Sequence, residues 1–302
     1  MTTPDIRDPW REEFQHAQLI GSWLASYSSP STRAAYRTDV KLFLEFIETM
    51  GMDLFEVRRQ HVNVFMRARE QVDSPSTLAR RTASISALYR YAMSEDLIDR
   101  NPAAMIRRPA VDKDHSTSEV LTNSEAIKFL EAAKKHSPRA YALVLLLLET
   151  GVRISEALDT TEVDLGADRL KIRRKGGKTA IVPLPEKLRI VLRELTGTTG
   201  QEIARGDEVS RPIFRTRTGT AWKRTDAARS LRSISQKADI GKVVTPHVLR
   251  HTHATLALSH GVPLHHLQDS LGHSDPRTTR RYDHDRSRLE NHSTHTVARL
   301  FD

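Results

Sequence analysis

Five short segments in the second half of the chain hold side chains that could do chemistry. They are TGVRISEAL at 150–158, KGGK at 175–178, TPHVLRH at 245–251, LGH at 271–273 and TTRRY at 278–282. Guanidinium groups bind phosphate oxygens, imidazole and ammonium groups exchange protons, and a phenol can act as a nucleophile. Taken one at a time, each segment also fits an ordinary surface or core role.

A metal site is the first alternative, because His247 and His251 stand four residues apart and could bind one ion together. The zinc-protease pattern has a glutamate directly after its first histidine, and Val248 stands at that place here. The sequence also lacks a cluster of carboxylates suited to two metal ions. We therefore expect neither a metal site nor a cofactor.

Together and in this order, the five segments resemble the tyrosine recombinase (phage integrase) family in its simple two-domain, Xer-like form. The resemblance covers nearly the whole chain, and its patterned part spans about 121–282. The nine-residue step from His273 to Tyr282 is also typical of the family. The family's catalytic positions fall on Arg153, Lys178, His247, Arg250, His273 and Tyr282, and all six hold the expected type of residue.

The resemblance implies metal-independent cleavage and rejoining of DNA through a 3′-phosphotyrosyl intermediate, with Tyr282 as the nucleophile. Only about one part in a thousand of free tyrosine is ionised at neutral pH, so the phenol must lose its proton during the attack. His247 is expected to take that proton, since histidine titrates near neutrality. Lys178 on a mobile hairpin is the expected general acid for the leaving 5′-oxygen, with nearby arginines lowering its pKa.

The same resemblance assigns the phosphate to two arginines and a histidine. Arg153 and Arg250 are expected to grip the non-bridging oxygens with always-charged guanidinium groups, as a metal ion does in other phosphoryl-transfer sites. His273 adds a further hydrogen-bond donor. Glu156 lies about one helical turn after Arg153, where it either orients the arginine or forms an ordinary surface pair.

Double-stranded DNA is the expected partner, clamped between the two domains with the linker crossing the duplex. The family presents the second and fourth helices of its first domain to DNA, and the second domain has a basic stretch at 215–232. Family members also pass a C-terminal helix, here near 294–301, to a neighbouring protomer. This implies a homo-tetramer, or a hetero-tetramer with a paralogue, around two duplexes. The candidate DNA contacts are Arg33, Arg37, Arg80, Arg81, Arg215, Arg217, Lys223, Arg224, Arg229 and Arg232.

Charge and composition agree with such a partner. The net charge is +9, and residues 111–302 hold 32 basic and 24 acidic side chains, so 8 of the 9 charges lie there. This balance favours a polyanion. The absence of cysteine excludes a disulfide scaffold, a thiolate zinc site and a cysteine nucleophile. The longest apolar run, 140–148, is about half of a membrane span, and the first ten residues show no apolar signal. We expect a cytoplasmic protein.

The elements that must position these residues are mainly α-helical. The first third of the chain shows the apolar period of amphipathic helices. Four such helices make a small bundle, which the resemblance identifies as a SAM-like core-binding domain over 1–106. Residues 107–120 are predicted to form an inter-domain linker. The four helices are expected at 10–27, from a cap at Ser31 or Thr32 to Gly51, near 60–70, and from 74 to 94.

The second domain, 121–302, is expected to be the catalytic domain of the family, mixed α with one small β-sheet. The run 140–149 is apolar on all sides and predicts a fully buried helix. Two strands, 169–174 and 179–184, are joined by the KGGK loop as a hairpin. Further helices are expected at 222–238, 247–260, 263–271 and near the C-terminus.

Two other functions fit parts of this pattern. A type IB topoisomerase-like nicking-closing enzyme uses the same cleavage chemistry without strand exchange, but the helical first domain and the short tail argue against it. A catalytically silent DNA-binding regulator needs none of the catalytic residues, and the intact set of six argues against that function. The sequence therefore favours a site-specific DNA recombinase.

Overall fold

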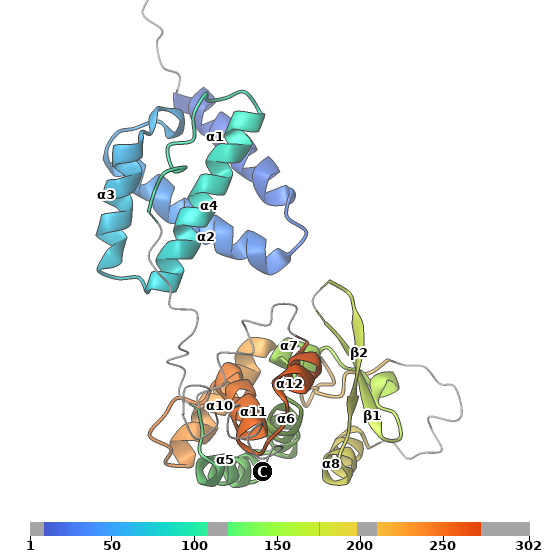
Figure 1. The fold of residues 1–302 in the computed structure, drawn as a ribbon. Helices are drawn as coiled ribbons and strands as arrows, with labels where there is room; N and C mark the ends of the chain where they lie inside the picture. Colours follow the sequence, from blue (N-terminus) through green and yellow to red (C-terminus); the bar gives the residue numbers. More distant parts are fainter. Residues whose placement is uncertain (1–8, 108–119, 175, 198–209, 273–302) are drawn as a thin grey trace, which may run out of the picture. The chain divides into compact units, whose positions relative to one another are not determined.

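The computed structural model describes residues 9–107, 120–174, 176–197 and 210–272 (Figure 1). The chain divides into two compact units, 1–112 and 113–302, and the division falls inside the expected linker 107–120. The described residues form helices and one two-stranded sheet, which confirms the mainly α class. No described helix combines the length and apolar character that crossing a membrane requires. His273, Tyr282 and the expected helix near 294–301 lie outside the described residues.

Four helices build the first unit, as the apolar period predicts. A short 3-10 turn, η1 (Leu54–Glu56), lies between the second and third helices. Large side chains from all four helices meet in one core, including Trp23, Phe43, Phe65 and Tyr89. The helices are α1 (Pro9–Ala25), α2 (Pro30–Thr49), α3 (Arg59–Glu70) and α4 (Pro75–Ser94).

Two of these helices, α2 and α4, begin with the same N-terminal capping motif, a serine followed by a proline. The Ser74 side chain accepts a hydrogen bond from the Thr77 N–H at 3.3 Å, as expected for the start of α4. For α2 the expectation of a Ser31 or Thr32 cap is wrong, because Ser29 caps the helix and accepts from the Thr32 N–H. Proline occupies the first helical position without a donor to satisfy, so the cap is the residue before it.

A buried ion-pair network ties α2, α3 and α4 together. Asp39 on α2 is fully buried and pairs with Arg80 and, at 3.0 Å, with Arg81 of α4. Arg81 also binds Asp73 at 2.7 Å, and Asp73 binds Arg69 at the end of α3 at 2.8 Å. Buried charges need such partners, because desolvation without pairing costs several kcal/mol per ion. Burial nevertheless raises the pKa of Asp39, against the opposing effect of both arginines.

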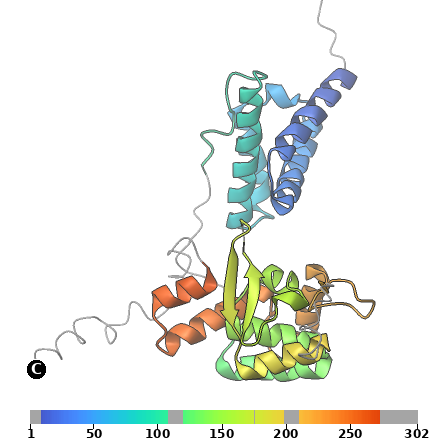
Figure 2. The same cartoon turned by 90° about the vertical axis from the view of Figure 1, so that its right-hand side faces the viewer.

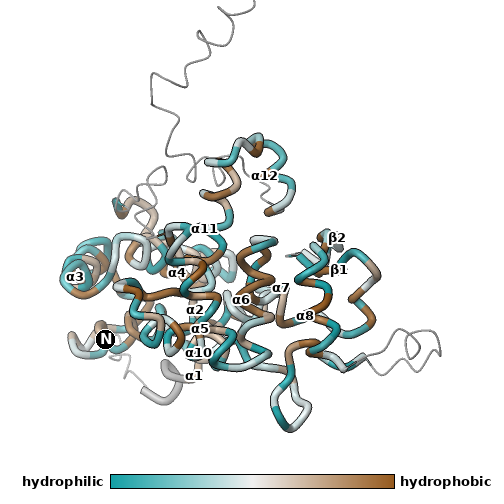
Figure 3. Tube along the Cα trace, turned by 90° about the horizontal axis from the view of Figure 1, so that it is seen from below, coloured by the Kyte–Doolittle hydropathy of each residue, from teal (hydrophilic) through white to brown (hydrophobic). Residues whose placement is uncertain are grey.

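The second unit is built around α6 (Pro138–Thr150). Most of its residues are fully buried, and Figure 3 draws it largely in the apolar colour. It packs against α5, α8, α10 and α11, and these helices cover most of its side chains. The buried helix expected at 140–149 is confirmed, with only Tyr141, Leu148 and Glu149 partly exposed. The other helices are α5 (Asn123–His136), α7 (Ile154–Leu158), α8 (Glu186–Thr196), α10 (Arg224–Lys237), α11 (Pro246–Ser259) and α12 (Leu264–Leu271), with a 3-10 turn η2 (Glu162–Asp164).

An antiparallel hairpin projects from this helical body (Figure 2). Strands β1 (Arg169–Arg173) and β2 (Thr179–Pro183) pair with Leu170 opposite Val182 and Ile172 opposite Ala180. Leu170, Ile172 and Val182 face the core, and their neighbours along each strand are exposed. The two predicted strands are confirmed, each one residue shorter than expected. The sequence analysis gave no bounds for the helices α5, α7 and α8.

The network around Asp73 generates a pH prediction. Hydrogen bonds from Arg69 and Arg81 lower the pKa of Asp73 to about 2, from 3.8. A depressed carboxyl pKa contributes stability above the unfolded value, and that stability is lost as the pH falls through the folded value. We expect Asp73→Asn to lower the unfolding free energy by about 2 kcal/mol at pH 6. The difference should shrink to about 0.4 kcal/mol by pH 2 in urea titrations, since half of the folded carboxyl groups are still ionised there. A difference that stays constant between pH 6 and 2 would contradict the assignment.

Candidate active site

Helix α11 carries two of the six candidate catalytic residues on one face. Thr245 caps it by accepting from the Val248 N–H at 3.2 Å, and Pro246 occupies its first position. His247 and Arg250 are three residues apart and therefore lie on the same side of the helix. His247 is exposed, whereas Arg250 is only 5% exposed. The TPHVLRH segment thus extends from the interior to the surface.

The Arg250 guanidinium joins three elements. Nη1 donates to the Gly151 carbonyl oxygen at 2.5 Å, and Nη2 donates to the Leu271 carbonyl oxygen at 2.8 Å. Gly151 ends α6 and Leu271 ends α12. The last carbonyls of a helix have no partner within it and carry partial negative charge. Two helix ends therefore compensate the buried positive charge, and the arginine holds both ends against α11.

Arg153 stands two residues after Gly151, at the N-cap of α7. The buried Glu156 carboxylate accepts from the Arg153 backbone N–H at 2.9 Å and from its guanidinium Nη1 at 2.7 Å. The Arg153 side chain is 39% exposed. The role of Glu156 that the sequence left open is thereby decided: it holds Arg153 at two points and orients the guanidinium.

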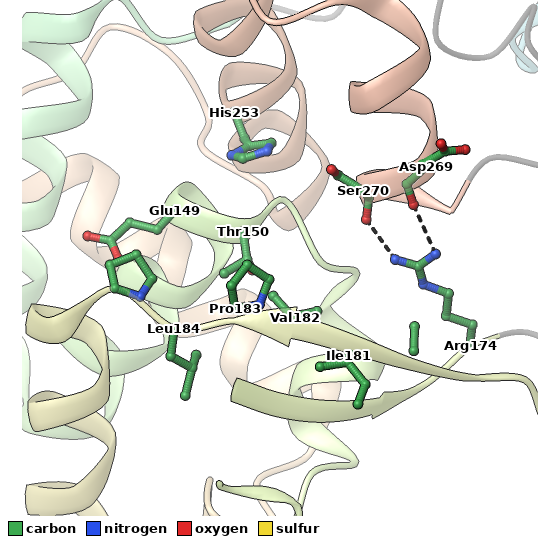
Figure 4. Close-up of a pocket in the computed structure, with 12 residues that line it drawn as sticks. Glu149, Thr150, Arg174, Ile181, Val182, Pro183, Leu184, His253, Asp269 and Ser270 are labelled. Carbon is green, nitrogen blue, oxygen red and sulfur yellow. Dashed lines mark hydrogen bonds between the residues drawn. The ribbon is translucent and has the colours of Figure 1, made fainter. Parts of the chain in front are cut away.

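Lys178 lies on the turn between β1 and β2 and is exposed. Its carbonyl oxygen accepts from the Arg174 N–H at 2.8 Å, and Gly176 and Gly177 both have positive φ, which closes the turn. The Arg174 guanidinium donates to the carbonyl oxygens of Asp269 and Ser270 at 3.3 and 2.6 Å (Figure 4). Arg174 thereby attaches the hairpin to the end of α12. The sequence analysis missed it, and its only signal was a basic residue directly before KGGK.

The last turn of α12 is where these contacts meet. Arg174 from the hairpin binds two of its carbonyls, and Arg250 from α11 binds the next one. Arg250 also binds the loop that leads into Arg153. The elements that carry Arg153, Lys178, His247 and Arg250 are therefore joined around one helix end. His273 and Tyr282 follow that end in the sequence but lie outside the described residues.

A cavity of about 670 Å³ opens between β2, the end of α6 and the end of α12 (Figure 4). His253 lines it and hydrogen-bonds through Nδ1 to the Leu148 carbonyl oxygen at 2.9 Å. Burial lowers the pKa of His253, and Arg250 acts in the same direction, while the bond to Leu148 opposes them. The lowered pKa favours the neutral form of His253. Burial also raises the pKa of Glu149 in the same cavity.

His251, one turn after His247 on α11, makes a direct contact with it. The two Nε2 atoms are 2.7 Å apart, and the rings meet edge to face with centroids 4.2 Å apart. His251 is only 3% exposed. Across the described ranges, no group of three or more histidine, aspartate or glutamate side chains could hold a metal ion.

The candidate DNA contacts divide into two groups. Arg37, Arg217, Lys223, Arg224, Arg229 and Arg232 are exposed, and Arg33 and Arg80 are half-buried, with Arg33 bound to the Tyr27 carbonyl oxygen at 2.8 Å. Two further candidates are held by carboxylates. Arg81 is buried between Asp39 and Asp73. Arg215 pairs with Glu162 and donates to the Thr196 carbonyl oxygen at 2.9 Å. Both guanidinium groups therefore hold carboxylate partners inside the protein.

Comparison with known proteins gives consistent matches. Residues 119–288 match the phage integrase family, and residues 23–96 match the phage integrase N-terminal SAM-like domain. The chain is 32% identical to a tyrosine recombinase XerC from Roseiflexus castenholzii, over 89% of this chain and 86% of that protein. It is 30% identical to a tyrosine recombinase XerD from Shewanella oneidensis, over 91% and 93%.

A solved structure shares the fold at low sequence identity. It is a lambda integrase tetramer bound to a Holliday junction, with a TM-score of 0.71 and 16% identity. The match covers 90% of this chain and 78% of that one.

Gly151 provides a test of the packing at the site. Its φ is +63°, and a Cβ there would lie 2.5 Å from the His253 ring and 2.7 Å from Leu271. Gly197 has a similar φ of +68° with open space around it. We expect Gly197→Ala to cost about 1–2 kcal/mol of unfolding free energy from backbone strain alone. Gly151→Ala should cost about 1–3 kcal/mol more, because its neighbours must move. Equal losses in urea titrations of the two variants would contradict the close packing.

Proposed function

Because the chain belongs to the phage integrase family of tyrosine recombinases, which are enzymes, we propose that it is a site-specific DNA recombinase. The proposed reaction cleaves and rejoins duplex DNA through a 3′-phosphotyrosyl link on Tyr282. The observation that carries the proposal is the buried Arg250. Its bonds to the ends of α6 and α12 bring the Arg153 loop, the His247 face of α11 and the chain leading to His273 to one place.

Phosphate binding is assigned to Arg153 and Arg250. A guanidinium has five N–H donors, so Arg250 can hold two backbone carbonyls and still contact a phosphate oxygen. Arg153 is held by Glu156 with part of its side chain exposed. Donors that are fixed before the substrate binds stabilise the charge that develops on a five-coordinate phosphorus without reorganising during the reaction. His273 would add another donor.

Proton transfer is assigned to three residues. Tyr282 attacks the phosphorus, and its proton passes to His247, which lies exposed near the start of α11. Lys178, exposed on the hairpin turn, protonates the leaving 5′-oxygen. Attack by a 5′-hydroxyl from another duplex reverses these steps and joins new partners, so the phosphodiester energy is conserved.

DNA binding and assembly follow from the same family assignment. The exposed basic residues Arg37, Arg217 and Arg224 support contacts with DNA phosphates in both units. The lambda integrase structure is a tetramer on a Holliday junction. We propose the same for this chain, as a homo-tetramer or with a paralogue, with the segment near 294–301 exchanged between protomers.

The decisive experiment is capture of the covalent adduct on a pool of nicked duplexes of randomised sequence. Wild-type protein should become linked to DNA, and Tyr282→Phe should abolish the link because no phenol oxygen remains to attack. Tyr91→Phe, in the first unit, is the matched control and should form the adduct normally. An adduct that survives in Tyr282→Phe refutes the assigned nucleophile. A wild-type protein that captures no duplex is a silent regulator, and one that only relaxes supercoiled plasmid is a topoisomerase.

Salt dependence separates the two groups of arginines. Each phosphate contact contributes about 0.9 to the slope of log affinity against log salt concentration. We expect Arg37→Gln and Arg224→Gln each to reduce that slope by about 0.9 on a captured duplex. Arg215→Gln should leave the slope unchanged, since its guanidinium is bound to Glu162. Slopes are compared by fluorescence anisotropy, with thermal melts to show that each variant is folded. Unchanged slopes for Arg37→Gln and Arg224→Gln would remove these residues from the interface.

A further inference from the structure

The contact between His247 and His251 constrains the proton that each imidazole carries. At 2.7 Å, the two Nε2 atoms are within hydrogen-bond distance. Two N–H groups cannot point at each other at that separation, and two lone pairs would repel. One Nε2 therefore donates and the other accepts, and the pair shares a single proton between these atoms.

The pair is also asymmetric in its surroundings. His251 is only 3% exposed and lies next to Arg250 on a helix packed against α6 and α12, so its ring is held in place. His247 is exposed one turn earlier. Nε2 of His247 is directed at His251. Nδ1 is therefore the ring nitrogen through which His247 can exchange a proton with a group outside the pair. The buried ring thus sets the orientation of the exposed one.

Resting on the proposed function, we propose that His251 is a positioning residue for the proton acceptor His247. His247 donates its Nε2–H to the Nε2 lone pair of His251, and this bond keeps a lone pair on His247 Nδ1. When Tyr282 forms its bond to phosphorus, the phenol O–H bond breaks and the proton binds His247 Nδ1. The resulting imidazolium keeps its Nε2–H bond to the neutral His251. On rejoining, the proton returns to the tyrosyl oxygen.

A neutral imidazole suits this site better than the carboxylate that often orients a catalytic histidine. A carboxylate would stabilise the imidazolium more strongly, but it would place a negative charge close to a phosphodiester dianion in the transition state. His251 supplies the lone pair without the charge.

The first test compares two substitutions of His251 by the rate of adduct formation on a duplex that wild-type protein captures. His251→Phe keeps the ring but removes Nε2, and should slow the adduct by on the order of 10–100-fold with unchanged DNA affinity. His251→Gln places an amide where Nε2 was, and should recover most of that rate. His260→Phe, an exposed histidine at the end of the same helix, is the matched control and should react normally.

The second test needs no DNA. Nitrogen-15 spectra of imidazoles in the full-length protein distinguish protonated from unprotonated ring nitrogens, and the His247 signals are assigned by their loss in His247→Gln. In wild-type protein His247 should show a protonated Nε2 and an unprotonated Nδ1. In His251→Phe it should show the averaged signals of two exchanging tautomers.

The outcomes separate this inference from the proposed function. If wild-type protein captures no duplex, the recombinase proposal fails, while the spectra still test the pair. If wild-type protein reacts and His251→Phe reacts equally fast, the positioning role is wrong and the recombinase proposal stands. Equal slowing by His251→Phe and His251→Gln in folded protein means that His251 only packs, which also overturns the inference. Identical His247 spectra in wild-type and His251→Phe protein overturn it independently.

Discussion

The arrangement of the second unit depends on one buried positive charge. Arg250 is nearly inaccessible, and its two described bonds go to the final carbonyls of α6 and α12. A charge in that position is tolerated only because two helix ends supply partial negative charge. The carbonyl oxygens at the two helix ends also need hydrogen-bond donors, and the Arg250 guanidinium supplies them. Neutralising Arg250 would leave three elements without the contact that joins them.

In the first unit, carboxylates rather than helix ends compensate a buried arginine. Asp39 and Asp73 bind the buried Arg81, and the two neighbouring arginines, Arg80 and Arg69, complete the network at its edges. The Asp39 pairs join the side of α2 to α4, and the Asp73 pairs join the end of α3 to α4. In both units a buried arginine joins several elements of the fold.

The side chains of the candidate site differ in how firmly their internal partners hold them. The Arg250 guanidinium is fixed by backbone carbonyls, and the Arg153 guanidinium by one oxygen of Glu156, whose other oxygen accepts from the Arg153 backbone N–H. Lys178 sits on a turn closed by two glycines, outside the helical core. This division is chemically sensible, because charge stabilisation favours rigid donors whereas a general acid must reach its leaving group. The His247–His251 pair lies between these extremes, one ring buried and one exposed.

Much of this protein was determined by local sequence. The order of the five segments identified the family and the mainly helical class, and the apolar period and the serine cap placed α4 and the buried α6. Only the tertiary structure shows which arginines hold internal carboxylate partners. Arg81 and Arg37 look alike in sequence, as do Arg215 and Arg224, but Asp39 and Glu162 stand 42 and 53 positions from the arginines they bind. The spacing of His247 and His251 placed their rings one helical turn apart, and the structure adds that their Nε2 atoms are 2.7 Å apart. The arginine–carboxylate pairs join side chains that are far apart in the sequence and meet only on folding, so no local pattern encodes them.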